Sequence, residues 1–378
     1  MTEPAPEVQL VDLGAQRRRL DGRIEAAMAA VLDHGRFVLG PEVGRFEEQL
    51  AALGGVAHAV GCSSGTDALL LALLAWGAGS GDAVFVPAFT FGATAEVVAL
   101  VGATPVFVDV RADTFTLDPA SLAAALEWVP RTGLRPVGVI AVDLFGQPAD
   151  YAGIGEVAAG AGLWVLADAA QSLGATLSGR SVGSLATATA TSFFPSKPLG
   201  CYGDGGAVLT ADADLAERLR SLRAHGRGVS RFDHVRVGVN ARLDTLQAAI
   251  LLAKLEVFDD ERTRRRGVAE RYGERLAGVV TVPSVLAGAT SAWACYTVVA
   301  PGRDRLAEAL GGAGIASAVY YRKPLHHQPA FRPFPTAPGG LPVSERLAEE
   351  VLSVPVHPYL GVPAQARVVD VITAASGR

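Results

Sequence analysis

One lysine of this sequence lies in a short, constrained loop where its amine could act as a nucleophile. Lys197 stands between Pro195 and Pro198, shortly after an apolar run that is typical of a strand. A residue that precedes proline is kept out of helical geometry, so the loop is predicted to have a fixed backbone. An amine desolvated beside aromatic side chains has a lowered pKa and is suited to Schiff-base chemistry. Taken alone, the same position also fits an ordinary lysine of a surface loop.

A carboxylate follows another apolar run. Asp168 comes directly after residues 163–167, and ligands of open α/β sheets bind at the carboxyl ends of such strands. A carboxylate there could pair with a pyridinium nitrogen and keep it protonated, which makes the ring an electron sink. The alternative is an aspartate that caps the N-terminus of a following helix.

A small-residue segment, Cys62-Ser63-Ser64-Gly65-Thr66-Asp67, is predicted to join a strand to a helix. The free backbone N–H groups and the dipole of a helix N-terminus attract anions such as phosphate. The spacing of Ser64 and Asp67 also resembles a capping box, so a well-capped helix without a ligand is the alternative.

Two further patterns are weak. Residues 153–158 mimic a dinucleotide-binding fingerprint, but they do not directly follow a strand. His326 and His327 are adjacent and the other five histidines are scattered singly. Structural or substrate-contacting roles are therefore favoured over metal ligation, and we predict no metal. The three cysteines show neither a disulfide framework nor a paired metal spacing.

The elements that must position these side chains alternate along the chain. Runs that are apolar throughout suit a parallel sheet covered by helices on both faces, so we predict an α/β fold. Helical spacing of apolar residues first appears at 21–32. The predicted strands occupy residues 57–62, 83–87, 104–110, 137–144, 163–167, 187–194 and 206–210.

A long helical pattern covers residues 243–276 and is expected to lead into a smaller C-terminal domain. We therefore divide the chain into a large domain, residues 1–250, and a small domain, residues 251–378. Lys254 lies within the helical pattern, and its ammonium group is expected to be solvated. The proline-rich stretch 324–342 is predicted to be an ordered surface loop.

Composition narrows the class of protein. The 378 residues are half hydrophobic, 19% are charged and the formal net charge is −5, so no basic surface for nucleic acid is expected. The arginine clusters at 17–19 and 262–266 are expected on solvated helix faces. The longest apolar run, 68–76, is too short to span a bilayer. Residues 1–6 lack the apolar core of a secretory leader. Because the three cysteines also form no disulfide framework, a reducing, cytoplasmic location is expected.

Together these motifs resemble the DegT/DnrJ/EryC1/StrS family of sugar aminotransferases over nearly the whole chain. The resemblance implies the fold of aspartate aminotransferase, fold type I of the enzymes that depend on pyridoxal 5′-phosphate (PLP). That fold has a mixed, mostly parallel sheet and a smaller C-terminal α+β domain. The matching segments are Val11-Asp-Leu, Gly40-Pro-Glu-Val, Ser64-Gly-Thr-Asp-Ala-Leu, Pro87-Ala-Phe-Thr-Phe, His225-Gly, Gly238-Val-Asn-Ala-Arg and Pro324-Leu-His-His-Gln-Pro.

The resemblance also implies roles around the cofactor ring. Lys197 would hold PLP as a Schiff base and shuttle a proton during the reaction. Asp168 would pair with the pyridine nitrogen, and Gln171 would contact the ring hydroxyl. Phe91 would stack on the ring face, although an apolar core position is the alternative for this side chain.

The cofactor phosphate would be held by the backbone of Gly65 and Thr66 and by Ser192. Asn240 would reach the phosphate of the neighbouring subunit's cofactor. The resemblance therefore implies a homodimer with shared active sites.

The implied reaction moves an amino group from an amino acid, expected to be L-glutamate, to a keto group of a nucleotide-linked sugar. Relatives with histidine at the lysine position perform dehydration, so Lys197 favours transamination. The segment around Lys197 is most similar to enzymes that aminate C3 of a UDP-linked 3-oxo-glucuronate derivative, and Arg242 matches an arginine that those enzymes use. They have His-Tyr-Pro where this chain has Tyr320-Tyr321-Arg322, and these three residues with Arg242 are the candidate substrate contacts.

Three other functions stay open at this stage. They are amination of a keto cyclitol, a PLP-dependent dehydration, and PLP binding by a regulator without turnover. The sequence does not choose among sugars, nucleotides, aminated carbons, amino donors or pathways.

Overall fold

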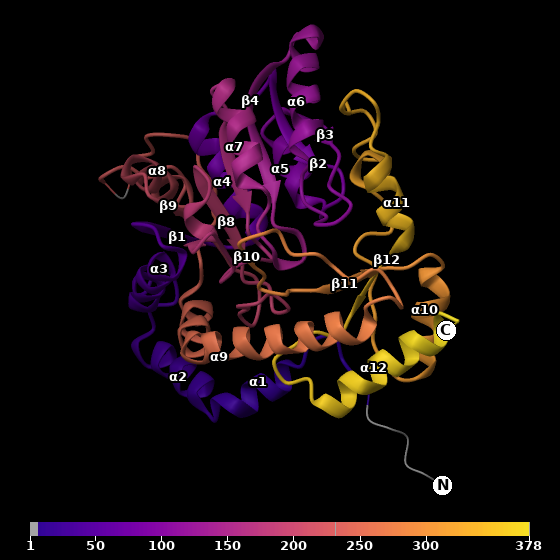
Figure 1. Cartoon of the computed structure of the whole chain (residues 1–378). Helices are drawn as coiled ribbons and strands as arrows, with labels where there is room; N and C mark the ends of the chain where they lie inside the picture. The colour runs from indigo at the N-terminus through magenta and orange to yellow at the C-terminus, as the bar shows by residue number, and fades with distance from the viewer. Residues whose placement is uncertain (1–6, 231, 378) are drawn as a thin grey trace.

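A seven-stranded sheet forms the centre of the larger part of the computed structural model, which describes residues 7–230 and 232–377 (Figure 1). Six strands, β1, β2, β3, β4, β5 and β8, run in the same direction, whereas β9 is antiparallel to both of its neighbours, β8 and β1. The predicted mixed, mostly parallel sheet is confirmed. Its order is β1 (His58–Cys62), β9 (Gly206–Thr210), β8 (Ala188–Ser192), β5 (Trp164–Asp168), β4 (Arg135–Val142), β2 (Asp82–Pro87) and β3 (Thr104–Val108).

Both faces of this sheet are buried, which explains why the strands read as apolar throughout. Along β9, Val208 packs into the cluster that contains residues of α4 and α8, while Leu209 on the opposite face packs against α3 and α9. Because successive side chains of a strand point to opposite faces of the sheet, neighbouring residues of β9 enter two separate cores. The covering helices are α3 (Pro41–Gly54), α4 (Gly65–Trp76), α5 (Ala93–Leu100), α6 (Pro119–Trp128), α7 (Tyr151–Gly160) and α8 (Ala213–Leu222).

A single long helix, α9 (Thr245–Leu276), connects the two parts of the molecule and crosses its lower half in Figure 1. Its first half carries Leu251 and Phe258 into the core shared with α3. Its second half carries Tyr272 and Leu276 into the core of the C-terminal part. Two N-terminal helices, α1 (Leu13–Leu20) and α2 (Arg23–His34), precede α3, and α1 and α2 both contribute to a further cluster with α9.

The C-terminal part is a small α+β unit. It pairs β11 (Tyr296–Val299) with β12 (Val351–Val354) in antiparallel fashion and packs α10 (Arg303–Gly312) against α12 (Val362–Ala375). The N-terminal Val8 also joins this core, beside Ile315. The division predicted at residues 250 and 251 falls inside α9, and it stays a prediction.

The remaining elements are short. A helix, α11 (Pro342–Glu350), precedes β12, and the predicted proline-rich loop before it contains one 3₁₀ turn. A small sheet joins β10 (Ala289–Thr290), β6 (Thr176–Leu177) and β7 (Arg180–Ser181). The 3₁₀ turns are η1 (Val129–Thr132), η2 (Leu144–Gly146), η3 (Val182–Ser184) and η4 (Leu325–His327).

Two predictions about α9 are wrong. Lys254 is 1% exposed: its Nζ donates to the carbonyl oxygen of Gly200 at 2.6 Å and lies 4.3 Å from the centre of the Tyr202 ring. Burial lowers the pKa of Lys254 to about 8. Arg265 is likewise buried rather than solvated. The cause is that α9 packs against α2, α3 and α12 on several sides, whereas helical spacing identifies only the most apolar stripe.

Other expectations concern what the chain lacks. Residues 153–158 lie inside α7 rather than in a glycine-rich loop, which agrees with rejecting the dinucleotide fingerprint. Over the part of the chain that the structure describes, no helix is long and apolar enough to cross a membrane. The prediction that residues 1–6 are not a secretory leader lies outside the described residues.

Candidate active site

The carboxyl ends of several strands meet at one edge of the main sheet. The parallel strands β2, β4, β5 and β8 end there, and β1 ends there too, because β1 and β8 are both antiparallel to β9 between them. A cavity of about 530 Å³ opens at this edge. The C-terminal part and the N-terminal segment close its other side, with Leu10, Val11, Ala294, Cys295, Tyr320, Tyr321, Ser353, Val354 and Val356.

One end of the cavity is the N-terminus of α4. Ser64 caps this helix, and its Oγ accepts the Asp67 N–H at 3.0 Å, so the predicted cap is present. The amides of Gly65 and Thr66 precede that bond and have no acceptor within residues 7–230 and 232–377. Both residues line the cavity. Unpaired N–H groups at a helix N-terminus, together with the helix dipole, form a cradle for an anion.

The cradle is closed by Ser192, the last residue of β8, which also lines the cavity. A Cβ atom built on Gly65 would lie 2.6 Å from the Cβ of Ser192, closer than side-chain atoms pack. Glycine at 65 thus lets the helix start approach the end of β8, and the Ser192 hydroxyl reaches the same space as the two amides.

Asp168 supplies a buried carboxylate deeper in the cavity. It ends β5, is 7% exposed, and accepts from Thr94 Oγ1 at 3.0 Å and from the Ala170 N–H at 3.2 Å. Burial raises the pKa of Asp168, and the Ala170 and Thr94 hydrogen bonds and the charge of Lys197 counteract this. No α-helix follows β5 before β6 in the structure, so the alternative of a helix-capping aspartate does not apply.

Lys197 approaches the same cavity from the loop after β8. Its backbone N–H donates to the Phe194 carbonyl at 2.9 Å, which forms a turn, and its side chain lines the cavity. Burial lowers the pKa of Lys197, while the charges of Asp168 and Cys295 act in the opposite direction. An amine whose cationic form is destabilised is more readily neutral and nucleophilic.

The Phe91 ring and the Gln171 amide line the cavity between these groups. Phe91 is 60% exposed in the cavity and its ring lies 6.3 Å from that of Tyr321, so the alternative of a core position is wrong. Gln171 Oε1 accepts the Phe145 N–H at 2.6 Å. The NH₂ group of Gln171, which also bonds to Tyr321, is the part of the amide that can donate to a ligand oxygen.

Sequence reasoning missed several lining residues. Thr94 is fully buried on α5 and orients Asp168, and no local pattern signals that contact. Cys295 lies near Lys197, and burial raises the pKa of its thiol to about 11. Val11, Leu69 and Thr90 lie in matched motifs and so carried a signal before the fold was known.

Three of the residues singled out in the sequence lie outside this cavity lining. Asn240 is exposed and Arg242 is half-buried on the segment before α9. Arg322 is exposed and pairs with Asp304 at 3.1 Å. Tyr320 and Tyr321, its neighbours, do line the cavity.

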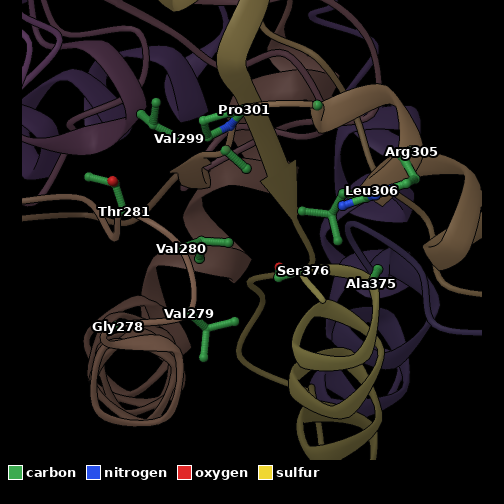
Figure 2. A pocket seen from close by; sticks show the side chains of 12 residues that line it. Gly278, Val279, Val280, Thr281, Val299, Pro301, Arg305, Leu306, Ala375 and Ser376 are labelled. Atoms are coloured by element: carbon green, nitrogen blue, oxygen red, sulfur yellow. The ribbon is translucent and has the colours of Figure 1, made fainter. Parts of the chain in front are cut away.

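A second cavity, of about 340 Å³, lies in the C-terminal part beside the ends of α9 and α12 (Figure 2). Figure 2 shows Val279, Val280 and Thr281 on one side of it and Ala375 and Ser376 on another. Of the twelve residues that line it, only Arg305 carries an ionisable side chain. It therefore offers no combination of acid, base and nucleophile.

The cavity at the sheet edge fits PLP by the chemistry of its groups. The amide and hydroxyl cradle suits a phosphate, the buried carboxylate suits a ring nitrogen, and the amide of Gln171 suits a ring hydroxyl. The exposed face of Phe91 suits a flat heterocycle, and Lys197 provides the amine that PLP requires.

Comparison with known proteins supports this picture. The family model described as the DegT/DnrJ/EryC1/StrS aminotransferase family matches residues 18–373. The chain is 45% identical to the UDP-2-acetamido-2-deoxy-3-oxo-D-glucuronate aminotransferase of Pseudomonas aeruginosa over 93% of this chain and 96% of that protein. It is 44% identical to the UDP-N-acetyl-3-dehydro-alpha-D-glucosamine 3-aminotransferase of Acidithiobacillus ferrooxidans, covering 97% of both. The structure of S. venezuelae DesV with a ketimine intermediate superposes with a TM-score of 0.93 at 40% identity, covering 99% of this chain and all of DesV.

Proposed function

Since this chain belongs to the DegT/DnrJ/EryC1/StrS aminotransferase family, we propose that it transfers an amino group from an amino acid to the keto group of a nucleotide-linked sugar. It is a PLP-dependent aminotransferase with the type I fold. The observation that carries the proposal is the placement of Lys197 and Asp168 in one cavity whose far end is an anion cradle. Retention of lysine favours transamination over dehydration.

Each polar group then has a distinct task toward the cofactor. When bound, PLP supplies an electron sink for the pair released at the substrate carbon. Gly65, Thr66 and Ser192 hold its phosphate. Asp168 holds the proton on the ring nitrogen, because a buried carboxylate beside that nitrogen favours its charged form. Gln171 donates to the ring hydroxyl.

Phe91 and Lys197 complete the machinery. Phe91 covers one ring face and excludes water from it. Lys197 holds the cofactor through its Nζ in the resting enzyme. Once displaced by the amino acid, the same Nζ takes a proton from the substrate carbon and returns it at the other reacting carbon. This role requires a neutral amine, and the lowered pKa of Lys197 favours that form.

For the acceptor we propose a UDP-linked sugar with a keto group at C3. The two curated relatives described above are named for such substrates at 45% and 44% identity, which supports this class over a keto cyclitol. Tyr320 and Tyr321 stand at the wall that the sugar would contact. Arg242 remains a proposed contact for an acidic sugar, and Arg322 a proposed contact for the diphosphate on release from Asp304. The amino donor is proposed to be L-glutamate.

A panel of nucleotide-linked keto sugars tests this function. The purified protein with PLP, L-glutamate and a UDP-linked 3-keto hexose or hexuronate should release 2-oxoglutarate in step with formation of the amino sugar, measured by mass spectrometry. The matched controls are the dTDP-linked 3-keto sugar, a 4-keto isomer and a keto cyclitol. Faster turnover of the cyclitol, or no conversion of glutamate with any acceptor, would contradict the proposal.

We further propose that the active unit is a homodimer. Asn240 is exposed and lies outside the cavity lining of its own chain. The segment before it carries apolar side chains that face solvent, with Val229, Val235 and Val237 at 109%, 60% and 93% exposure. Apolar side chains gathered on one exposed loop favour coverage by another protein surface. A second copy that covers this loop would bring Asn240 to the phosphate end of the partner's cavity.

Hybrid dimers test the shared site. Lys197→Ala and Asn240→Ala chains, each strongly impaired alone, should regain activity on mixing, because one of the two sites in a hybrid receives an intact Lys197 and an intact Asn240 from different chains. Two tags and tandem purification isolate the hybrids for the rate measurement. The matched control mixes Lys197→Ala with Asp168→Asn: both lesions lie in the cavity of their own chain, so no site is restored. Equal activity of the two hybrids would argue against a shared site.

A further inference from the structure

Three potential metal ligands converge outside the active-site cavity. His326 and His327 belong to η4, and Glu345 belongs to α11, which lies beside the β3 edge of the molecule (Figure 1). His326 Nε2 lies 3.2 Å from Glu345 Oε1, and His327 Nε2 lies 3.5 Å from the same oxygen. One ligand atom from each of the three residues lies within 4.8 Å of the others.

These separations match those of ligands that share one small cation. Zinc binds histidine nitrogen and carboxylate oxygen at about 2.0–2.2 Å in tetrahedral geometry. Two ligands at that distance and angle are about 3.4 Å apart, close to both nitrogen–oxygen distances. Two imidazoles and one carboxylate also form the ligand type that borderline-soft divalent metals prefer.

The ligands are held by surroundings that need little rearrangement. The His326 side chain is 8% exposed and its ring lies 6.4 Å from that of Phe107. The neighbouring Leu325 N–H donates to the Ala88 carbonyl at 2.8 Å, which fixes η4 against the sheet. On the other side, Asp109 accepts the Ser344 N–H at 2.8 Å and anchors the start of α11 next to Glu345. These two backbone contacts fix the turn and the helix that carry the three side chains.

The cluster is open to solvent on one side. His327 and Glu345 are about half exposed, so an ion has an entry path and room for a water as the fourth ligand.

We propose that His326, His327 and Glu345 form a binding site for one divalent transition-metal ion of the zinc class. The site would join the turn that follows Tyr320 and Tyr321 to α11, and so restrain a wall of the active-site cavity from outside. Sequence spacing alone does not reveal it, because Glu345 lies 18 residues after His327 and reaches the histidines only through the fold.

Metal titration of the whole, tag-free holoenzyme tests the proposal. After treatment with a chelator, Zn²⁺ is titrated by calorimetry, and Co²⁺ is titrated by its visible absorption, which is intense only in tetrahedral sites. One equivalent should bind per chain and raise the thermal unfolding midpoint, because an ion that binds only the folded state stabilises it.

Variants separate this site from any other. Glu345→Gln retains the side-chain shape and a hydrogen-bond acceptor but loses the charge. Glu345→Gln and His327→Ala, each made singly, should each weaken metal binding by about tenfold or more. His58→Asn, remote on β1, is the matched control and should bind as the parent does. No stoichiometric binding by the parent, or unchanged binding and unchanged Co²⁺ absorption in the Glu345→Gln and His327→Ala variants, would overturn the proposal.

Discussion

A Lys197→Ala chain is expected to lose transamination almost completely, by a factor of at least ~10⁴, the upper range of a positioned acid–base group. Lys197 is proposed to hold the cofactor and to move the proton between the reacting carbons, so one change removes both functions. The cofactor should still bind, because Gly65, Thr66, Ser192 and Asp168 remain, but it should dissociate on dialysis more readily than in the parent. The rate of 2-oxoglutarate release measures the first effect, and cofactor absorbance after dialysis measures the second.

Chemical mapping shows which lysine is involved. Borohydride reduction of the parent should fix the cofactor to the peptide that contains Lys197, and mass spectrometry can locate it. Lys254 is the demanding control, because burial lowers its pKa to about 8 as well. Its Nζ is engaged with the Gly200 carbonyl and the Tyr202 ring, outside the cavity lining. Labelling at Lys254, or a Lys197→Ala chain as active as Lys254→Met, would refute the assignment.

The sheet and the groups at its edge were predictable because they depend on local pattern. Strands buried on both faces are continuously apolar, and the polar residue that ends such a run lies at the ligand-binding edge. Asp168 and the start of α4 could be placed in this way. The role of Lys197 needed the resemblance to a family, because a lysine between two prolines fits a surface loop equally well.

The rest of the site depends on contacts between distant segments. Thr94 reaches Asp168 across 74 positions of sequence, and Cys295 enters the cavity from the C-terminal part. Lys254 and Arg265 are buried on α9, which packs against helices from both ends of the chain. Periodicity describes one face of one element, so it does not report which other element covers the opposite face. Contacts across subunits, such as the one proposed for Asn240, are further from local pattern still.

The second large effect is expected at Asp168, and it tests the mechanism rather than the identity of the cofactor lysine. A protonated ring nitrogen accepts the electrons released when the substrate C–H bond breaks, and a neutral one does so poorly. The Asp168 carboxylate favours the proton on that nitrogen, and Thr94 and Ala170 stabilise the carboxylate against its burial. Asp168→Asn preserves the shape and the acceptor for the Ala170 N–H, and its NH₂ group can donate to Thr94 Oγ1 where the carboxylate accepted. It removes the charge.

The Asp168→Asn chain should therefore bind PLP through Lys197 and the phosphate cradle, while its half-reaction with L-glutamate slows by orders of magnitude. Each ~1.4 kcal/mol of lost transition-state stabilisation costs tenfold in rate. Thr94→Val is the graded control: it removes one hydrogen bond to the carboxylate, worth about 1.5–3 kcal/mol, and keeps the charge, so it should slow the same step by only about 10- to 150-fold. Stopped-flow absorbance of the cofactor during mixing with L-glutamate measures both variants in the same step. A parent-like rate for Asp168→Asn with cofactor bound would mean that this carboxylate only stabilises the turn after β5, since the charge would then contribute nothing to proton removal.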